Sequence, residues 1–229
     1  MRAVLLLHGA GGSVRATFDP TGWRAALAAA GRNVIAIDLP GHGPSPQPRD
    51  PAAYADLASQ IAPHIPAEGC DAIGFSLGAK LVLELAARRP QMFGRIVLGG
   101  LGDNLFAPER VGEAVAAALE HGPGADTPPP VLAFLAQYDP GPGDPLALAA
   151  VMRRPPNPII AAGRLASVRH PILVVNGASD PVATPDTRLR GELPAARFVE
   201  LPGIGHFDLP HAAAFQALAL TFLARGDIK

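Results

Sequence analysis

The sequence predicts an α/β fold, in which a mostly parallel β-sheet carries helices on both faces. Short apolar runs alternate with amphipathic stretches in the N-terminal part and again near the C-terminus. This alternation is typical of strand–helix–strand units, which right-handed crossovers assemble into a parallel sheet. The chain has 229 residues, of which 48% are apolar, enough for one such domain with a sizeable core.

Six short segments, most of them apolar runs, are the expected strands, because each is bounded by glycine, proline or polar residues and is too short for a core helix. The segments are Ala3–Leu7, Val34–Ile37, Ala72–Phe75, Arg95–Leu98, Pro171–Val175 and Arg197–Leu201. Continuous apolar runs are typical of strands that are buried on both faces. We therefore expect about six parallel strands.

Capping residues and apolar residues at helical spacing mark the helices between these strands. The first helix is expected to begin at Asp19-Pro20 and to end at Gly31, and the second to open at Asp50-Pro51. A third follows Ser76 and ends before Pro90. Later in the chain we expect a short helix over residues 186–193 and a last helix that begins near Pro210 and buries Phe215, Leu218, Phe222 and Leu223.

Residues 103–168 interrupt the alternation of strands and helices. Prolines and glycines divide this stretch into short helical pieces, expected at residues 108–121, 131–137, 144–153 and 159–167. No run within it resembles a strand, and the stretch is too long for a plain loop. We expect residues 1–102 and 169–229 to form the core, and residues 103–168 to form an inserted helical lid (cap).

Composition excludes several classes of function. The net charge is −1, from 19 basic and 20 acidic residues, and no basic block indicates a nucleic-acid partner. The single cysteine, Cys70, excludes an internal disulfide or a cysteine-based zinc site, and we expect no metal and no cofactor. The apolar run Ala3–Leu7 is too short for a signal peptide, and no segment approaches the ~18 apolar residues of a membrane span. We expect a cytoplasmic protein without a membrane partner, whose oligomeric state the sequence leaves open.

The sequence Gly74-Phe75-Ser76-Leu77-Gly78 places a serine between an expected strand and an expected helix. A sharp turn at this point would expose the serine hydroxyl at its tip, in a strained backbone conformation. Such a turn leaves no room for Cβ atoms two residues to either side, which explains glycine at both positions. The helix that follows brings free N–H groups and a positive dipole end to the same place.

Further polar residues are expected at the same edge of the sheet, because functional groups gather at the carboxyl ends of parallel strands. His206 follows the last strand and could take the proton of Ser76 as this serine attacks. Asp180 follows the preceding strand and could orient that histidine. The order Ser76, Asp180, His206 is the order found in α/β-hydrolases.

Other residues at this edge have competing interpretations. Asp103 follows the fourth strand and is an alternative acid for the histidine, whereas Asp208 is too close to His206 in sequence to orient it easily. Asp38 is expected to brace its own loop. His8 and His42 lie in glycine-rich loops, and we interpret both as structural or supporting residues.

Five motifs in this order resemble those of the α/β-hydrolase superfamily, in its lid-bearing branch of serine hydrolases. They are His8-Gly9-Ala10-Gly11-Gly12-Ser13, Asp38-Leu39-Pro40-Gly41-His42-Gly43, Gly74-Phe75-Ser76-Leu77-Gly78, Gly177-Ala178-Ser179-Asp180-Pro181-Val182 and Gly205-His206-Phe207. The resemblance implies that the backbone N–H groups of Ala10 and Leu77 form an oxyanion hole. The family usually begins with an antiparallel hairpin that this chain lacks, so we expect a trimmed sheet edge.

This resemblance implies a carboxylesterase-like serine hydrolase, with water and a small or medium acyl ester as substrates. A serine at the turn disfavours the dehalogenases and epoxide hydrolases of this fold, which use aspartate there. Phe75, Phe106, Phe134, Tyr138 and Phe207 are candidates for an acyl pocket. Hydrolysis of thioesters, lactones or C–C bonds and cofactor-free perhydrolysis need the same triad and stay open. So does a hydrolase-fold receptor for a small molecule.

Overall fold

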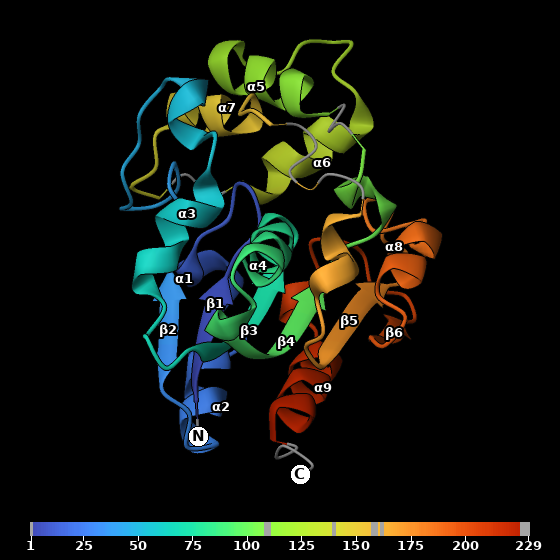
Figure 1. Cartoon of the computed structure of the whole chain (residues 1–229). Coiled ribbons are helices and arrows are strands. Elements are labelled where there is room, and N and C mark those ends of the chain that lie inside the picture. The colour runs from blue at the N-terminus through green and yellow to red at the C-terminus, as the bar shows by residue number, and fades with distance from the viewer. Residues whose placement is uncertain (1, 108–110, 139–140, 157–159, 161–162, 225–229) are drawn as a thin grey trace.

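A six-stranded parallel sheet forms the centre of the molecule (Figure 1). The computed structural model describes residues 2–107, 111–138, 141–156, 160 and 163–224. The strands are β1 (Ala3–Leu7), β2 (Val34–Ile37), β3 (Cys70–Phe75), β4 (Phe93–Gly99), β5 (Ile172–Gly177) and β6 (Arg197–Leu201). They lie in the order β2-β1-β3-β4-β5-β6, and each neighbouring pair is parallel. The predicted fold class is confirmed.

Strand burial follows from position in the sheet. All residues of β3 and β5 are buried, whereas β2 is half-buried and β6 contains only half-buried and exposed residues. The strands inside the sheet are therefore covered on both faces, as in other parallel sheets. In the part of the chain that the structure describes, β2 forms one edge of the sheet and β6 the other.

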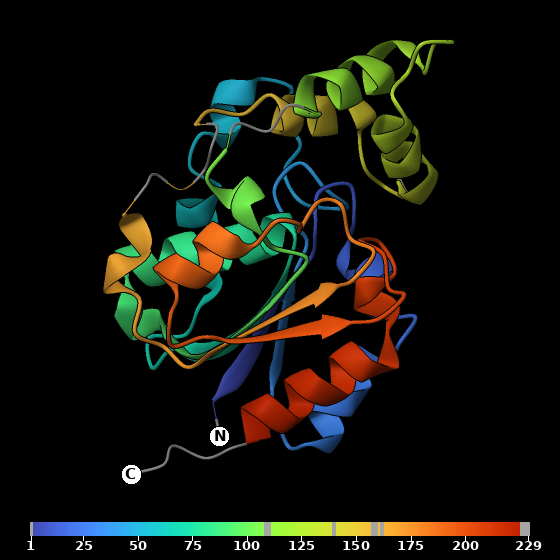
Figure 2. The ribbon, with the colours of Figure 1, turned by 90° about the vertical axis from the view of Figure 1, so that its right-hand side faces the viewer.

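Helices cover both faces of the sheet, and Figure 2 shows them on opposite sides. One face carries α1 (Val14–Thr17), α2 (Trp23–Ala29) and α9 (Ala213–Ala224). Trp23 anchors this layer: it packs edge-on against Phe215, with ring centroids 5.2 Å apart, and donates a hydrogen bond of 2.8 Å to the Pro210 carbonyl. The other face carries α3 (Leu57–Ile61), α4 (Leu77–Arg88) and α8 (Thr187–Glu192).

Three helices between β4 and β5 lie beyond the carboxyl ends of the strands (Figures 1 and 2). They are α5 (Gly112–His121), α6 (Pro129–Gln137) and α7 (Pro145–Met152), and they share a separate apolar cluster that includes Val115, Val131 and Met152. The described part of the segment contains no strand, as predicted. Its two ends, η4 (Asp103–Leu105) and η5 (Arg164–Ser167), pack against the core helices α8 and α4.

Several predicted helix boundaries are wrong. The first helix does not begin at Asp19, whose side chain forms an ion pair with Arg24. Instead, the short helix α1 comes first and is capped by the Ser13 side chain. The helix α2 then begins after Gly22. The helix expected from Asp50-Pro51 is broken into η1 (Pro51–Tyr54), α3 and η2 (Ala62–His64), because the Asp56 side chain starts a new helix and Pro63 removes an N–H donor.

Other boundaries shift by a few residues. η3 (Pro90–Met92) precedes β4, and η6 (Leu209–His211) precedes α9. In α9, Phe215 and Leu223 are buried as expected, but Leu218 and Phe222 are only half-buried. The expected helices over 108–121 and 159–167 lie partly outside the described residues. In the described part, the helix expected over 108–121 is α5, which begins at Gly112, and the helix expected over 159–167 is the short η5.

None of the described helices combines the length and the apolar character that crossing a bilayer requires.

A buried ion pair at the amino end of the sheet links the residues before β2 to the start of β3. Arg32 and Asp71 are each 6% exposed and bind each other, and Arg32 also donates to the Arg2 and Leu223 carbonyls. Removing one partner of such a pair leaves the other charge buried and uncompensated.

We expect Arg32→Met to lower the free energy of unfolding by about 3 kcal/mol, because the Asp71 carboxylate loses the guanidinium and keeps the Arg95 N–H (2.7 Å), which carries no full charge. Equilibrium denaturation with urea measures this loss. Arg24→Met is the matched control, since the Arg24–Asp19 pair is exposed and should contribute less than about 1 kcal/mol. Equal losses in the two variants would contradict the expectation.

Candidate active site

Ser76 stands at a sharp turn between β3 and α4. Its backbone has φ of 51° and ψ of −112°, and it is the one residue other than glycine with a positive φ among those that the structure describes. A Cβ on Gly74 would lie 2.7 Å from the backbone of Ala79, and a Cβ on Gly78 would overlap the Leu7 carbonyl. Both glycines are therefore required for this turn, as the sequence predicts.

The structure brings Ser76, His206 and Asp180 into one hydrogen-bonded series. His206 Nε2 lies 3.1 Å from Ser76 Oγ, and His206 Nδ1 lies 2.7 Å from Asp180 Oδ2. The second carboxylate oxygen of Asp180 accepts the N–H groups of Val182 (2.8 Å) and Ala183 (3.0 Å). Because Asp180 is buried and both its oxygens are occupied, its position relative to the imidazole is fixed. This geometry suits transfer of the serine proton to Nε2.

Two aromatic rings and a glycine surround the His206 ring. The Phe75 ring lies tilted beside it and the Phe207 ring edge-on, with centroids 5.0 and 5.3 Å away. Gly100 lies on another side of the ring. A Cβ added to this glycine would lie only 2.9 Å from the imidazole Cε1, which is too close for a side chain. Gly100 was not among the predicted site residues, although a Gly99-Gly100 pair at the end of an apolar strand indicates a close approach at this point.

The alternative acid, Asp103, does not contact His206. Its carboxylate accepts the N–H groups of Arg188 (3.1 Å) and Leu189 (2.9 Å) at the start of α8. It therefore satisfies the otherwise unpaired donors of a helix N-terminus. The buried Asn176 was not predicted to have a role. Its side chain accepts the Leu101 N–H (3.0 Å) and donates to the Leu101 carbonyl (2.9 Å), which ties the loop after β4 to the end of β5.

The two expected oxyanion donors lie on either side of the turn. Leu77 is the first residue of α4, so its N–H has no partner within the helix. Ala10 follows Gly9, and a Cβ on Gly9 would lie 3.2 Å from the Ser76 Cβ, so this loop passes directly beside the serine. The Gly78 N–H donates to the His8 carbonyl (3.1 Å) and joins the start of α4 to the end of β1.

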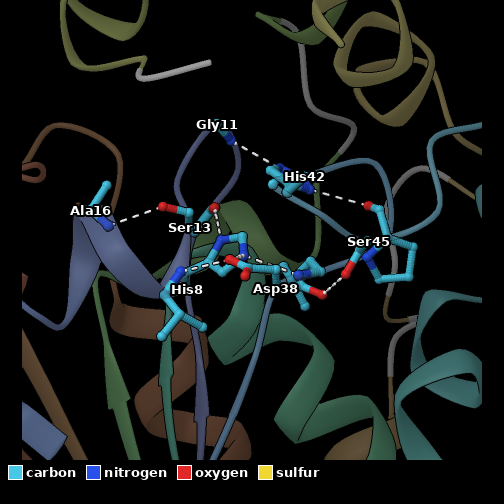
Figure 3. A network of polar contacts seen from close by, with 12 residues as sticks. His8, Gly11, Ser13, Ala16, Asp38, His42 and Ser45 are labelled. Carbon is cyan, nitrogen blue, oxygen red and sulfur yellow. Dashed lines mark hydrogen bonds and ion pairs between the residues drawn. The ribbon is translucent and has the colours of Figure 1, made fainter. Parts of the chain in front are cut away.

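His8, Asp38 and His42 connect the loops that follow β1 and β2 (Figure 3). The Leu39 N–H donates to His8 Nε2 (3.0 Å), and the Gly11 N–H donates to His42 Nε2 (3.0 Å). The Asp38 carboxylate accepts the Val14 N–H (2.7 Å), and the Asp38 carbonyl accepts the Ser45 hydroxyl (2.6 Å), so Asp38 braces the neighbouring segment as well as its own loop. Burial lowers the pKa of His8 to about 4 and that of His42 to about 3, so both rings are neutral at pH 7.

The predicted pocket residues have different surroundings. The ring of Phe134, on α6, lies against Gly11, and Phe75 and Phe207 flank His206. Phe75 is buried, whereas Phe134 and Phe207 are half-buried. Phe106 stacks with the Arg188 guanidinium, 4.1 Å from its ring centroid, and Tyr138 packs against the apolar cluster beneath α4. Three of the five aromatic residues are thus beside the loops of the site.

Within the described ranges, no group of three or more His, Cys, Asp or Glu side chains has an arrangement that could hold a metal ion.

The chain is similar to known proteins in sequence and in fold. The sequence model of the Alpha/beta hydrolase family matches residues 4–219. The chain is 31% identical over 270 aligned positions to a pimeloyl-[acyl-carrier protein] methyl ester esterase of Neisseria meningitidis serogroup B, covering 99% of this chain and 94% of the relative.

Two further similarities extend over the whole chain. A 2-hydroxymuconate semialdehyde hydrolase of Pseudomonas sp. (strain CF600) is 26% identical over 253 positions, covering 98% of this chain and 87% of the relative. The crystal structure of BpoC from Mycobacterium tuberculosis H37Rv superimposes with a TM-score of 0.76 at 21% identity, covering 98% of this chain and 92% of BpoC. The last similarity concerns the fold.

The buried neutral histidines predict a loss of stability in mild acid. An unfolded histidine binds a proton below pH ~6.5, whereas His8 and His42 stay neutral until about pH 4 and 3, so stability falls as the pH falls through this window. At pH ~5 each histidine should cost about 2 kcal/mol relative to pH ~7. Urea denaturation at the two pH values measures the difference.

His42→Gln should remove about half of this pH dependence, since one of the two titrating groups is gone. His211→Gln is the matched control, because His211 is exposed and its loss should leave the pH dependence unchanged. A His42→Gln protein with the full pH dependence of the unaltered chain would refute this explanation.

Proposed function

Because the chain belongs to the alpha/beta hydrolase family, we propose that it is a serine esterase that cleaves a small or medium acyl ester through an acyl-enzyme. The observation that carries this proposal is the series of hydrogen bonds from Ser76 Oγ through His206 to Asp180. A serine hydroxyl is a weak nucleophile until a base accepts its proton. His206 is within reach of that proton, and Asp180 stabilises the imidazolium that forms.

In the first half of the reaction, Ser76 Oγ attacks the ester carbonyl carbon as its proton passes to His206 Nε2. The negative charge that develops on the carbonyl oxygen is stabilised by the N–H groups of Ala10 and Leu77, and a single donor of this kind contributes about 3–4 kcal/mol. The tetrahedral intermediate collapses as His206 protonates the leaving alcohol. The acyl group remains on Ser76.

In the second half, a water molecule gives a proton to His206 and attacks the acyl carbonyl. Collapse of the second tetrahedral intermediate releases the carboxylic acid, and His206 returns the proton to Ser76 Oγ. The net reaction consumes an ester and water and yields an acid and an alcohol. It uses no group beyond the triad and the two backbone donors.

The helices of residues 103–168 act, in this proposal, as a lid over the acyl chain. The contact of Phe134 with Gly11 supports the assignment, because it places an aromatic ring of α6 beside one of the expected oxyanion donors. Phe75 and Phe207 border the same region, whereas Phe106 and Tyr138 are weaker candidates for the pocket.

Two relatives suggest substrates to be tried first. The relative at 31% identity is a methyl ester esterase for a pimeloyl group on an acyl-carrier protein, which favours methyl esters of medium-length acids for this chain. A second candidate function is hydrolysis of a muconate semialdehyde, since a relative at 26% identity is named for it.

We expect an organophosphonate probe to add its mass to the protein at Ser76, and Ser76→Ala to abolish the labelling and lower kcat by about 10⁴-fold or more. Mass spectrometry and turnover of a p-nitrophenyl ester measure both. Ser167→Ala, which removes an exposed serine, is the control and should label normally. Labelling that persists in Ser76→Ala would disprove the assignment of the nucleophile.

A panel of substrates measures the pocket directly. We expect p-nitrophenyl esters of graded acyl length to show an optimum at short to medium chains, and methyl esters of medium acids to be hydrolysed. A thioester, a lactone and 2-hydroxymuconate semialdehyde complete the panel. If one of these three has the highest kcat/KM, the triad is retained and the ester assignment is wrong.

A further inference from the structure

The direction of the Ala10 N–H is set by the carbonyl of Gly9. Both groups belong to one planar trans peptide unit and point to opposite sides of it. The Gly9 carbonyl accepts hydrogen bonds from His8 Nδ1 (2.7 Å) and from the Gly12 N–H (3.1 Å). These bonds fix the peptide plane on one side of the Ala10 Cα.

The next peptide plane, between Ala10 and Gly11, is held from outside the loop. The Gly11 N–H donates to Nε2 of His42, which lies 31 residues away on the loop after β2. The other ring nitrogen of His42, Nδ1, donates to the Pro40 carbonyl at 3.1 Å. The His42 side chain therefore bridges the two loops, as Figure 3 shows.

Such a restraint is necessary because the loop is rich in glycine. Gly9, Gly11 and Gly12 surround Ala10, and glycine gives the backbone more freedom than any other residue. An oxyanion donor contributes most when it is already aimed at the developing charge and needs no reorganisation. A glycine-rich loop does not by itself hold the Ala10 N–H in one direction.

His42 suits the task because it is buried and neutral. It is 3% exposed, and one ring nitrogen accepts while the other donates, which only the neutral ring with hydrogen on Nδ1 permits. The His8 ring packs edge-on against it, with centroids 5.0 Å apart, and is held in turn by the Leu39 N–H. The loop after β2 thus acts as a rigid support for the loop after β1.

We propose that His42 is a positioning residue for the esterase reaction: by accepting the Gly11 N–H, it holds the Ala10 N–H toward the oxyanion. The inference rests on the proposed function, and it assigns His42 an effect on the transition state that is separate from folding. Support for the transition state appears in kcat and leaves KM nearly unchanged.

Two substitutions separate the two hydrogen bonds of His42. In His42→Gln, the longer side chain can place an acceptor where Nε2 lies and keep the Gly11 bond. In His42→Asn, the amide reaches only the Nδ1 position and keeps the bond to the Pro40 carbonyl. We expect His42→Asn to lower kcat on a p-nitrophenyl ester at least about tenfold with little change in KM, and His42→Gln to retain most of the activity.

Binding of a boronic acid, which forms a tetrahedral adduct with the serine, provides a second readout. Its affinity should fall in His42→Asn by the same factor as kcat/KM, because both depend on the oxyanion hole. Amide hydrogen exchange at Gly11 should accelerate in His42→Asn and much less in His42→Gln. His170→Asn, which removes a histidine bound to the Pro90 carbonyl at the other end of the sheet, is the control and should change none of these.

The outcomes distinguish this inference from the proposed function. Full kcat in His42→Asn, in a protein that Ser76→Ala inactivates, would overturn the inference alone. So would the reverse order, with His42→Gln the poorer enzyme, because the Pro40 bond would then be the important one. A wild-type protein that neither turns over esters nor labels at Ser76 would end the proposed function, and the inference with it.

Discussion

The contact between the start of α4 and the end of β1 is the constraint on which the site depends. Gly78 lies so close to the Leu7 carbonyl that no side chain fits between them, and its N–H binds the His8 carbonyl at 3.1 Å. This contact forces the chain to leave β3 in a strained turn, with Ser76 at φ of 51°. It also places Leu77 beside the glycine-rich loop, so the positions of Ser76 and of both expected oxyanion donors depend on this one contact.

Around this contact, the site is built from loops held by buried polar side chains. Asp180 is bound by two backbone N–H groups, Asn176 ties down the loop after β4, and His8 and His42 join the loops after β1 and β2. Each of these side chains satisfies backbone groups that would otherwise be buried without partners. The same bonds that make the loops compatible with burial make them rigid enough for catalysis.

The strand pattern and the glycine-flanked serine were readable from the sequence because each depends on local chemistry. Buried strands require continuous apolar runs, and the turn at Ser76 requires Gly74 and Gly78. Helix boundaries in the first half were less readable: Ser13 and Asp56 both cap helices, but many serines and aspartates in this chain cap nothing. Which carboxylate contacts His206 depended on the distance between Asp180 and His206 in space, to which the order along the chain is only a guide.

The contact of His42 with the neighbouring loop could not be predicted from the sequence, for a different reason. The sequence shows two glycine-rich loops, each with a histidine, but not that the ring of one accepts an N–H of the other. That contact depends on β1 and β2 being neighbours in the sheet. Pairing between strands is a property of the whole fold, and so is any network that spans two strand ends.

Gly100 contributes to the site by having no side chain, which leaves room for the His206 ring. It brings no reactive atom, yet the imidazole of His206 lies where its side chain would be. Searches for functional positions usually look for reactive side chains and would pass over it. In this protein, adding a single methyl group at residue 100 would be expected to push aside the rings of His206 and Phe75, although residue 100 itself carries no reactive group.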